Sequence, residues 1–230
     1  MTELELIVFD WDGTIMDSTA AISLSICAAA ADLGLRVPSQ REAADVIGLS
    51  MRDALARVVP DLTADKVAEF NDRYRVHYMA SDPELLPFNG IPELLEELAA
   101  SPVMVAVATG KSRGGLIRVL DALDWHRYFL STRCGDDRYP KPHPWMLEDL
   151  IAELGVAHTG TVMVGDTTHD LGMARAAGVS AIGVTYGSAP VRPPTSPNRV
   201  RVCGLICRCQ TRRAPSRRLS CAIRASCAHI

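Results

Sequence analysis

The chain of 230 residues is long enough for one large domain, or for a core domain that carries an insertion. Its 48% apolar and 22% charged residues exclude disorder of the whole chain, and its 5% aromatic residues argue against a broad stacking surface for bases or sugars. The net charge of −3 is uneven, because residues 1–190 contain all 27 acidic residues and 15 of the 24 basic ones, whereas residues 191–230 contain nine arginines and no acidic residue.

No targeting or membrane-spanning segment is expected. The first residues are acidic where a signal peptide is basic, and the run of small apolar residues at 19–31 is too short to span a bilayer. Only Cys27 and Cys134 precede residue 190, so no disulfide framework is expected there. We therefore expect a cytoplasmic protein that does not associate with membranes.

The first predicted strand covers residues 4–9, an apolar run that stops at Asp10. Only helical patterns follow it up to residue 86, at 18–33, 40–46, 51–59 and 63–79, with prolines between them. Such a stretch after the first strand predicts a separate all-helical domain, residues 18–86, inserted into a core made of residues 1–17 and 87–190.

The rest of the core alternates helices and strands. Further apolar runs of strand length come at 103–108, 161–164 and 180–184, and helices are predicted at 91–100, 116–123, 145–154 and 169–177. This alternation predicts an α/β fold, in which helices cover both faces of a parallel sheet. In such folds ligands bind at the carboxyl ends of the strands.

Two acidic pairs lie where predicted strands end. Asp10 and Asp12 follow the first strand and project to the same side, and Gly13 lets the backbone pass close to a ligand. Asp166 and Asp170 follow the strand at 161–164. Either pair by itself is also typical of a turn or a helix cap. Together they favour a site for a hard divalent cation, and Mg²⁺ fits because it shares its ligands with phosphate.

Anion-binding groups follow the same strands. Thr109 and Gly110 offer a hydroxyl and an amide at a predicted helix start, although alone this pattern is more often a simple turn. Only three basic residues are lysines, and Lys141 lies among three prolines that fix its backbone. A rigid loop with one ammonium group suits a phosphate oxygen, with a surface lysine as the alternative. Lys66 and Lys111 are expected to be solvated.

In this order, the motifs DWDGT at 10–14, Thr109 after a strand, Lys141 in KPHP and GDTTHD at 165–170 resemble those of the haloacid dehalogenase superfamily. The resemblance covers residues 4–187 and is closest to its phosphoglycolate phosphatase-like branch. It implies a Rossmann-like core, a helical cap domain, and Mg²⁺-dependent hydrolysis of a small phosphorylated metabolite by a monomer or homodimer.

The resemblance also implies residue roles. Asp10 would be the nucleophile that forms an aspartyl-phosphate, and Asp12 the general acid and base. Mg²⁺ would be held by the Asp10 carboxylate, the Asp12 carbonyl, Asp166 and Asp170. Gly13, Thr109, Gly110 and Lys141 would bind the phosphate, with Thr109 and Lys141 counted among the catalytic residues.

Other interpretations stay open. The same scaffold also supports phosphosugar mutases, which transfer the phosphoryl group to a sugar instead of water. In the cap, Arg52 is a candidate for binding a substrate carboxylate, with a solvated helix residue as the alternative. Tyr74, Arg75 and His77 are further candidates of the same kind.

The family pattern ends at Gly187, and residues 191–230 are rich in Arg and Cys. We expect this tail to be disordered, or translated out of frame, and to leave one sheet edge uncovered. Two functional alternatives are a Zn²⁺ site, from Cys203, Cys207, Cys209, Cys221, Cys227 and His229, and a binding module that uses the basic tail. The tail lacks aromatic residues, which argues against nucleic acid as a partner.

Overall fold

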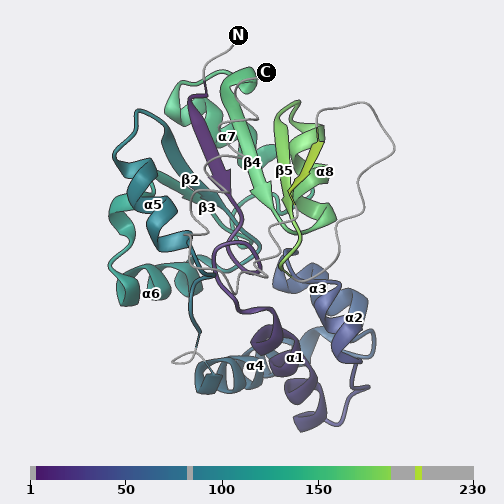
Figure 1. The fold of residues 1–230 in the computed structure, drawn as a ribbon. Coiled ribbons are helices and arrows are strands. Elements are labelled where there is room, and N and C mark those ends of the chain that lie inside the picture. Colours follow the sequence, from purple (N-terminus) through teal and green to yellow (C-terminus); the bar gives the residue numbers. More distant parts are fainter. Residues whose placement is uncertain (1–3, 82–84, 188–199, 204–230) are drawn as a thin grey trace.

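The structure is a computed structural model that describes residues 4–81, 85–187 and 200–203. Its sheet has six parallel strands in the order β3-β2-β1-β4-β5-β6 (Figure 1). The strands are β1 (Leu6–Phe9), β2 (Met104–Ala108), β3 (Ser131–Arg133), β4 (Thr161–Gly165), β5 (Ser180–Val184) and β6 (Val200–Cys203). The predicted α/β fold is confirmed.

Strand β1 lies in the middle of the sheet, and its neighbours end level with it. Phe9, the last residue of β1, is paired with Val107 of β2 and with Val164 of β4. The residues that follow these three strands therefore meet at the carboxyl-terminal end of the sheet. Strand order also reverses between β1 and β4, which is where α/β proteins form their ligand crevice.

Helices cover both faces of the sheet, because side chains alternate along each strand. Ile7 and Phe9 pack on the face with α5 (Ile91–Ala99) and α6 (Arg113–Leu123). Leu6 and Val8 pack on the opposite face with α7 (Trp145–Leu154) and α8 (Thr168–Ala176). The sequence did not predict strand β3, because its three residues, Ser-Thr-Arg, are only half buried and form no apolar run.

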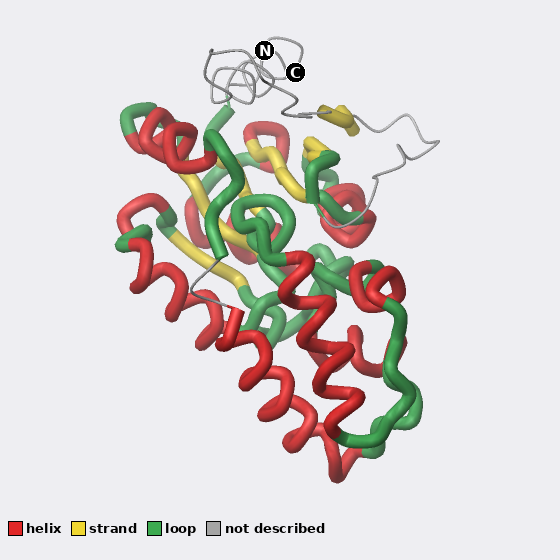
Figure 2. The backbone as a smooth tube through the Cα atoms, turned by 60° about the horizontal axis from the view of Figure 1, so that its bottom comes forward, coloured by secondary structure: helices red, strands yellow, loops and turns green. Residues whose placement is uncertain are grey.

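A second layer of helices lies beyond the carboxyl ends of the strands (Figures 1 and 2). This helical group consists of α1 (Thr19–Asp32), α2 (Gln40–Ala44), α3 (Met51–Val58) and α4 (Val67–Ser81), with a short 3₁₀ turn at Ala64–Lys66. It has an apolar core of its own, to which α1 contributes Ile26, α3 Leu55 and α4 Phe70.

The chain enters and leaves the helical group at neighbouring points. The amide of Asp17 donates to the carbonyl of Leu86 at 3.0 Å, and the amide of Phe88 donates to the carbonyl of Ile15 at 2.9 Å. Two short crossings tied together in this way are a suitable place for a hinge between the sheet and the helical group.

Strand β6 differs from what the sequence predicted for the tail. Residues 200–203 pair in parallel with β5 and cover its outer edge, although residues 191–230 were expected to be disordered and to leave an edge open. The other tail residues, with the Zn²⁺ candidates Cys207, Cys209, Cys221, Cys227 and His229, lie outside the described residues.

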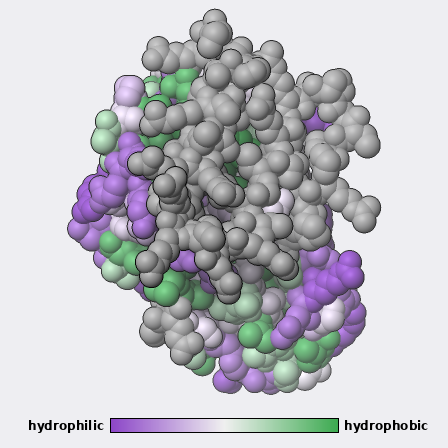
Figure 3. Space-filling view, viewed as in Figure 1, coloured by the Kyte–Doolittle hydropathy of each residue, from purple (hydrophilic) through white to green (hydrophobic). Residues whose placement is uncertain are grey.

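The described surface has hydrophilic residues (purple) on the left of the sheet layer and at the lower right, over the helical group (Figure 3). Within the described part of the chain, no helix combines the length and apolar character needed to cross a membrane.

Candidate active site

Residues that follow β1, β2 and β4 come together at the carboxyl-terminal end of the sheet, which faces the helical group. Asp10, Thr109 and Asp166 directly follow these strands, and all three are buried. Asp170 joins them from the first turn of α8, and Lys141 from the loop between β3 and α7. The structure thus brings together side chains that the sequence analysis selected from four separate segments.

Three of these carboxylates form a cluster suited to a cation. Asp10, Asp166 and Asp170 each offer an oxygen, and these oxygens lie within 4.8 Å of one another. Oxygen Oδ2 of Asp10 is buried and has no hydrogen-bond partner among the described residues. A set of hard oxygen donors with one unpaired buried oxygen fits Mg²⁺.

Electrostatics inside the cluster explain why it favours a cation. Burial raises the pKa of Asp10 well above its usual range, the charges of Asp170 and Asp166 raise it further, and Lys141 opposes the rise. Three buried carboxylates with one ammonium group therefore leave an excess of negative charge. A divalent ion would favour the ionised form of Asp10.

Lys141 is fully enclosed. Its Nζ donates to Oδ1 of Asp10 at 2.6 Å and to Oδ1 of Asp170 at 2.5 Å. Burial by itself lowers the pKa of this ammonium group, but the charges of Asp10 and Asp170 outweigh burial and raise it. Lys141 is therefore a buried, charged side chain and not the surface lysine of the alternative interpretation.

Asp170 is held by the start of α8. The Thr167 hydroxyl and backbone amide both donate to Oδ2 of Asp170, at 2.7 and 3.0 Å, and the Asp170 amide donates back to the hydroxyl at 3.3 Å. This capping box leaves Oδ1 for Lys141. The helix-cap alternative and the cation-site prediction for Asp170 are thus compatible, because its two oxygens face different partners.

The Asp12 carboxylate is not part of the cation cluster of Asp10, Asp166 and Asp170. Its Oδ1 accepts hydrogen bonds from the Ser18 hydroxyl at 2.7 Å and from Nζ of Lys111 at 3.1 Å. Lys111 also donates to the Tyr78 hydroxyl of α4 at 3.0 Å. The prediction that Lys111 is solvated is wrong, since its side chain is only 9% exposed.

Two glycines allow close approaches at the site. Gly13 has a φ of 88°, and a Cβ there would lie 2.4 Å from Oδ2 of Asp166. At Gly110 a Cβ would lie 2.4 Å from the carbonyl oxygen of Leu49 and 2.6 Å from that of Gly48, both from the loop before α3. The backbone of the helical group therefore packs directly against the loop that follows β2.

The predicted cap residues have different positions. Arg52 is exposed on α3, Arg75 is exposed and pairs with Asp72 on α4, and His77 contacts Asp32 of α1 at 2.8 Å. Only Tyr74 of this set reaches toward the site, through its stacking on Tyr78 with ring centroids 5.7 Å apart.

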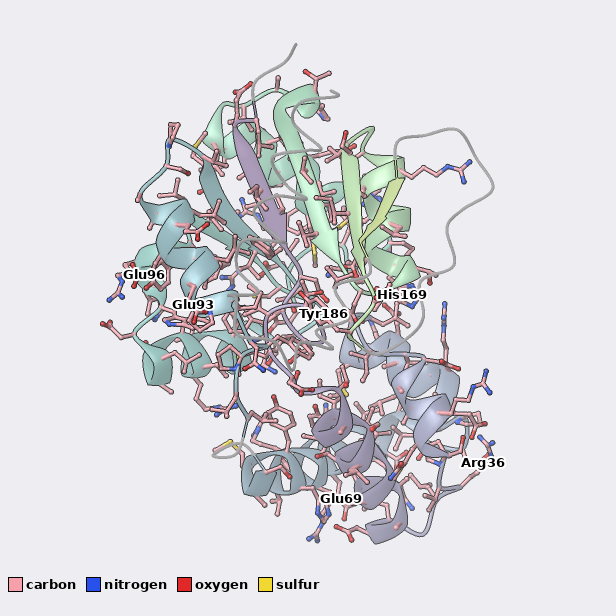
Figure 4. The ribbon with its side chains drawn as sticks, in the orientation of Figure 1. Arg36, Glu69, Glu93, Glu96, His169 and Tyr186 are labelled. Atoms are coloured by element: carbon pink, nitrogen blue, oxygen red, sulfur yellow. The ribbon has the colours of Figure 1, made fainter. Side chains whose placement is uncertain are left out.

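Sequence analysis did not select Tyr78, His169 or Tyr186. Tyr186 lies at the centre of the molecule, where its hydroxyl donates to the Thr14 carbonyl at 3.0 Å (Figure 4). His169 lies at the start of α8, next to α3, and partial burial lowers its pKa (Figure 4). Position just after a predicted strand could have singled out Tyr186, but no sequence signal identified Tyr78.

Residues 7–184 match the sequence pattern of the family described as haloacid dehalogenase-like hydrolase. The chain belongs to this family. It is 34% identical to the probable phosphatase IndB of Dickeya dadantii, over 79% of this chain and 81% of that protein. It is 31% identical to a phosphoglycolate phosphatase of Agrobacterium fabrum, over 81% of this chain and 82% of that protein.

Solved structures agree with this assignment. A predicted phosphoglycolate phosphatase from Haemophilus somnus 129Pt superposes with a TM-score of 0.79 and 25% identity, covering 96% of this chain and 99% of that one. A hydrolase from Pseudomonas syringae superposes with a TM-score of 0.74 at 20% identity and supports the fold alone, over 81% of this chain and 87% of that one. The haloacid dehalogenase-like chain described here is thus an enzyme of the phosphatase type, as the sequence predicted.

Proposed function

We propose that this haloacid dehalogenase-like phosphatase hydrolyses a small, phosphoglycolate-like phosphomonoester with Mg²⁺ and through an aspartyl-phosphate on Asp10. The observation that carries the proposal is the unpaired, buried Oδ2 of Asp10 inside a ring of Asp166, Asp170 and Lys141. Names of related proteins, phosphoglycolate phosphatases among them, support the substrate class.

Mg²⁺ would be held by the carboxylates of Asp10, Asp166 and Asp170, together with the backbone carbonyl of Asp12. When bound, it would neutralise the phosphate oxygens and the negative charge that develops during transfer. Thr109, the Gly110 amide and Lys141 would bind the remaining phosphate oxygens. The Gly13 amide already donates to the Met16 carbonyl at 2.9 Å, so Gly13 would contribute through the close approach that its backbone allows. Lys141 also keeps Asp10 and Asp170 in place, through its two short hydrogen bonds.

Asp10 and Asp12 would divide the chemistry between them. In the first step an oxygen of Asp10 attacks phosphorus, the ester bond breaks, and Asp12 gives its proton to the departing alcohol oxygen. In the second step Asp12 takes a proton from a water molecule that attacks phosphorus and releases Asp10. Asp12 suits this role because Ser18 and Lys111 hold its carboxylate outside the cation cluster.

The helical group would act as a cap that closes over the substrate. Its loop before α3 packs on Gly110, and Tyr78 of α4 contacts Lys111. Closure would exclude water until the phosphoryl group has moved to Asp10, and the paired crossings at Asp17 and Leu86 would allow opening.

The proposal is tested by phosphate release from a panel of small phosphate esters, phosphoglycolate included, with Mg²⁺ or with EDTA. We expect Mg²⁺-dependent release from the wild-type protein and none from the Asp10→Asn variant. The matched control is Asp72→Asn, because Asp72 is an exposed aspartate on the outside of α4. This variant should release phosphate like the wild type.

Release that persists in EDTA or in a folded Asp10→Asn variant would contradict the proposal. A folded wild-type protein that transfers phosphate to a sugar faster than to water would replace hydrolysis by the mutase reaction.

A further inference from the structure

Lys111 is a largely enclosed cation, with its side chain 9% exposed, that the proposed reaction does not use for phosphate or for Mg²⁺. Its Nζ lies 3.1 and 3.4 Å from the two oxygens of Asp12 and 3.0 Å from the Tyr78 hydroxyl, and 4.7 Å from the centre of the Tyr78 ring. Core and helical group thus meet at this ammonium group. Its neighbours combine one carboxylate with one neutral hydroxyl.

Lys141, the fully buried lysine of the site, differs from Lys111 in its partners. Lys141 donates to two carboxylates, those of Asp10 and Asp170, so its charge is fully offset. The charge of Lys111 is offset by the single carboxylate of Asp12. The three donors of Lys111 face the two oxygens of that one carboxylate and the neutral Tyr78 hydroxyl, so a second anion beside Tyr78 would replace a neutral partner or the long 3.4 Å contact, at a place where water screens little.

The position of Lys111 relative to Asp12 defines which anion this would be. A departing oxygen that receives a proton from Asp12 must lie about 2.6–3.2 Å from its carboxylate. With Nζ of Lys111 at 3.1 Å from the same carboxylate, that oxygen lies within about 6 Å of the ammonium group. A carboxylate one or two carbons from the ester oxygen is of the right size to bridge this distance.

We infer that Lys111, together with Tyr78, forms an anion subsite for the alcohol part of the substrate. The substrate is then a phosphomonoester whose alcohol carries a carboxylate close to the ester oxygen. The inference rests on the proposed function, because it takes Asp12 as the proton donor to the alcohol.

This subsite differs from the one that the sequence analysis considered at Arg52. Arg52 is exposed on α3, where an ion pair is screened by water and contributes little. Lys111 is enclosed between core and cap, so a substrate carboxylate that pairs with it is desolvated and discriminated strongly from a neutral group.

The test compares two esters of the same length, 2-phosphoglycolate and ethyl phosphate, which differ in the terminal carboxylate. We expect the wild-type protein to prefer phosphoglycolate in kcat/KM, and Lys111→Met to reduce this preference by about 30-fold or more. Lys66→Met is the matched control, because Lys66 lies exposed in the 3₁₀ turn of the cap. This control should keep both kcat/KM values and their ratio. Arg52→Met should also keep the ratio.

A ratio near one in the wild-type protein would overturn the inference. So would an equal loss of activity toward both esters in Lys111→Met, which indicates that Lys111 only supports Asp12. Loss of the ratio in Arg52→Met but not in Lys111→Met would assign the carboxylate to Arg52 instead. If Lys111→Met does not fold, Lys111→Gln serves in its place, since it keeps a donor toward Asp12 and Tyr78 without the charge.

A binding measurement separates this inference from the proposed function. In Asp10→Asn protein with Mg²⁺, calorimetric titration should give weaker binding of phosphoglycolate when Lys111→Met is added, and unchanged binding of ethyl phosphate. Equal binding of phosphoglycolate with and without Lys111 would overturn the subsite. Absence of turnover by a folded wild-type protein, with the Lys111 effect on binding intact, would refute the hydrolysis and not the subsite.

Discussion

Asp10 is placed where its ionised form is unfavourable without a cation. Burial and the neighbouring carboxylates raise its pKa, so in the metal-free protein this side chain costs folding free energy whenever it is ionised. Lys141 offsets only part of this cost, because it is shared with Asp170. Such a residue serves its chemistry at the expense of stability.

We therefore predict that Asp10→Asn raises the thermal stability of the metal-free protein. Between the ordinary pKa of an aspartate and the raised pKa of Asp10, the folded state binds more protons than the unfolded state, so the contribution of Asp10 to stability falls as pH rises. The gain in Tm of Asp10→Asn over wild type, measured in EDTA, should be smallest near pH 4 and grow toward neutral pH. Each kcal/mol gained corresponds to about 2–4 °C in a chain of this size.

Added Mg²⁺ provides the complementary measurement. It should raise the Tm of the wild-type protein more than that of Asp10→Asn, because the variant has lost one anionic ligand. A wild-type Tm that exceeds the variant's in EDTA at neutral pH would show that the ion pair with Lys141 outweighs the cost of burying Asp10.

The structure brings together central residues that the sequence analysis had placed at one end of the sheet, and there is a physical reason for this. Carboxyl ends of neighbouring parallel strands meet, so residues after predicted strands, such as Asp10, Thr109 and Asp166, could be placed together. Tyr78 and Lys111 could not be placed, because their contact depends on how a helix of the insertion lies against the core.

Elements, rather than single residues, determine the contact between the sheet layer and the helical group. The loop between α2 and α3 packs its backbone carbonyls against Gly110, so the interface leaves no room for a Cβ. This contact needs a glycine for space and not for its backbone conformation, since Gly110 is not among the residues with positive φ. No pattern in the sequence distinguishes this reason for glycine from an ordinary turn.

Gly110→Ala should therefore push the loop with Gly48 and Leu49 away from the loop that follows β2. A Cβ at 2.4 Å from the Leu49 carbonyl oxygen faces backbone, which cannot rotate aside as a side chain can. We expect kcat/KM for the preferred ester to fall by about tenfold or more, because a small misplacement of positioning groups slows a reaction strongly. We also expect amide hydrogen exchange at Gly48 and Leu49 to accelerate.

The control for this variant is four residues away. Gly114→Ala lies on α6 with open space around its Cβ, so it should keep the activity and gain up to about 1 kcal/mol in stability from helix propensity. Equal kcat/KM values for Gly110→Ala and wild type would contradict the tight contact between cap loop and core.

On the scale of the whole molecule, the sequence predicted the central strands and the covering helices better than the edge strands β3 and β6. Buried strands consist of apolar runs, so the sequence predicted β1, β2, β4 and β5. It also predicted the helices that alternate with them. Edge strands β3 and β6 carry polar or basic residues and gave no such signal. The helices α1 to α4 were expected from a stretch of about seventy residues without a strand pattern, which needs no knowledge of how they pack.

Edge strand β6 belongs to the basic tail, residues 191–230, and its effect on stability can be predicted. Strand β6 covers β5, while the candidate catalytic residues from Asp10 to Asp170 all precede the tail. A chain that ends at Cys203 should therefore keep the Mg²⁺-dependent hydrolysis of the full chain. A chain that ends at Gly187 should keep the hydrolysis but lose stability and self-associate, because the unpaired groups of β5 are then exposed. Thermal melts and size-exclusion chromatography with light scattering measure both. If the shorter chain stays as stable and as dispersed as the longer one, β6 contributes nothing to the sheet, and loss of hydrolysis in both would instead give the tail a part in the active protein.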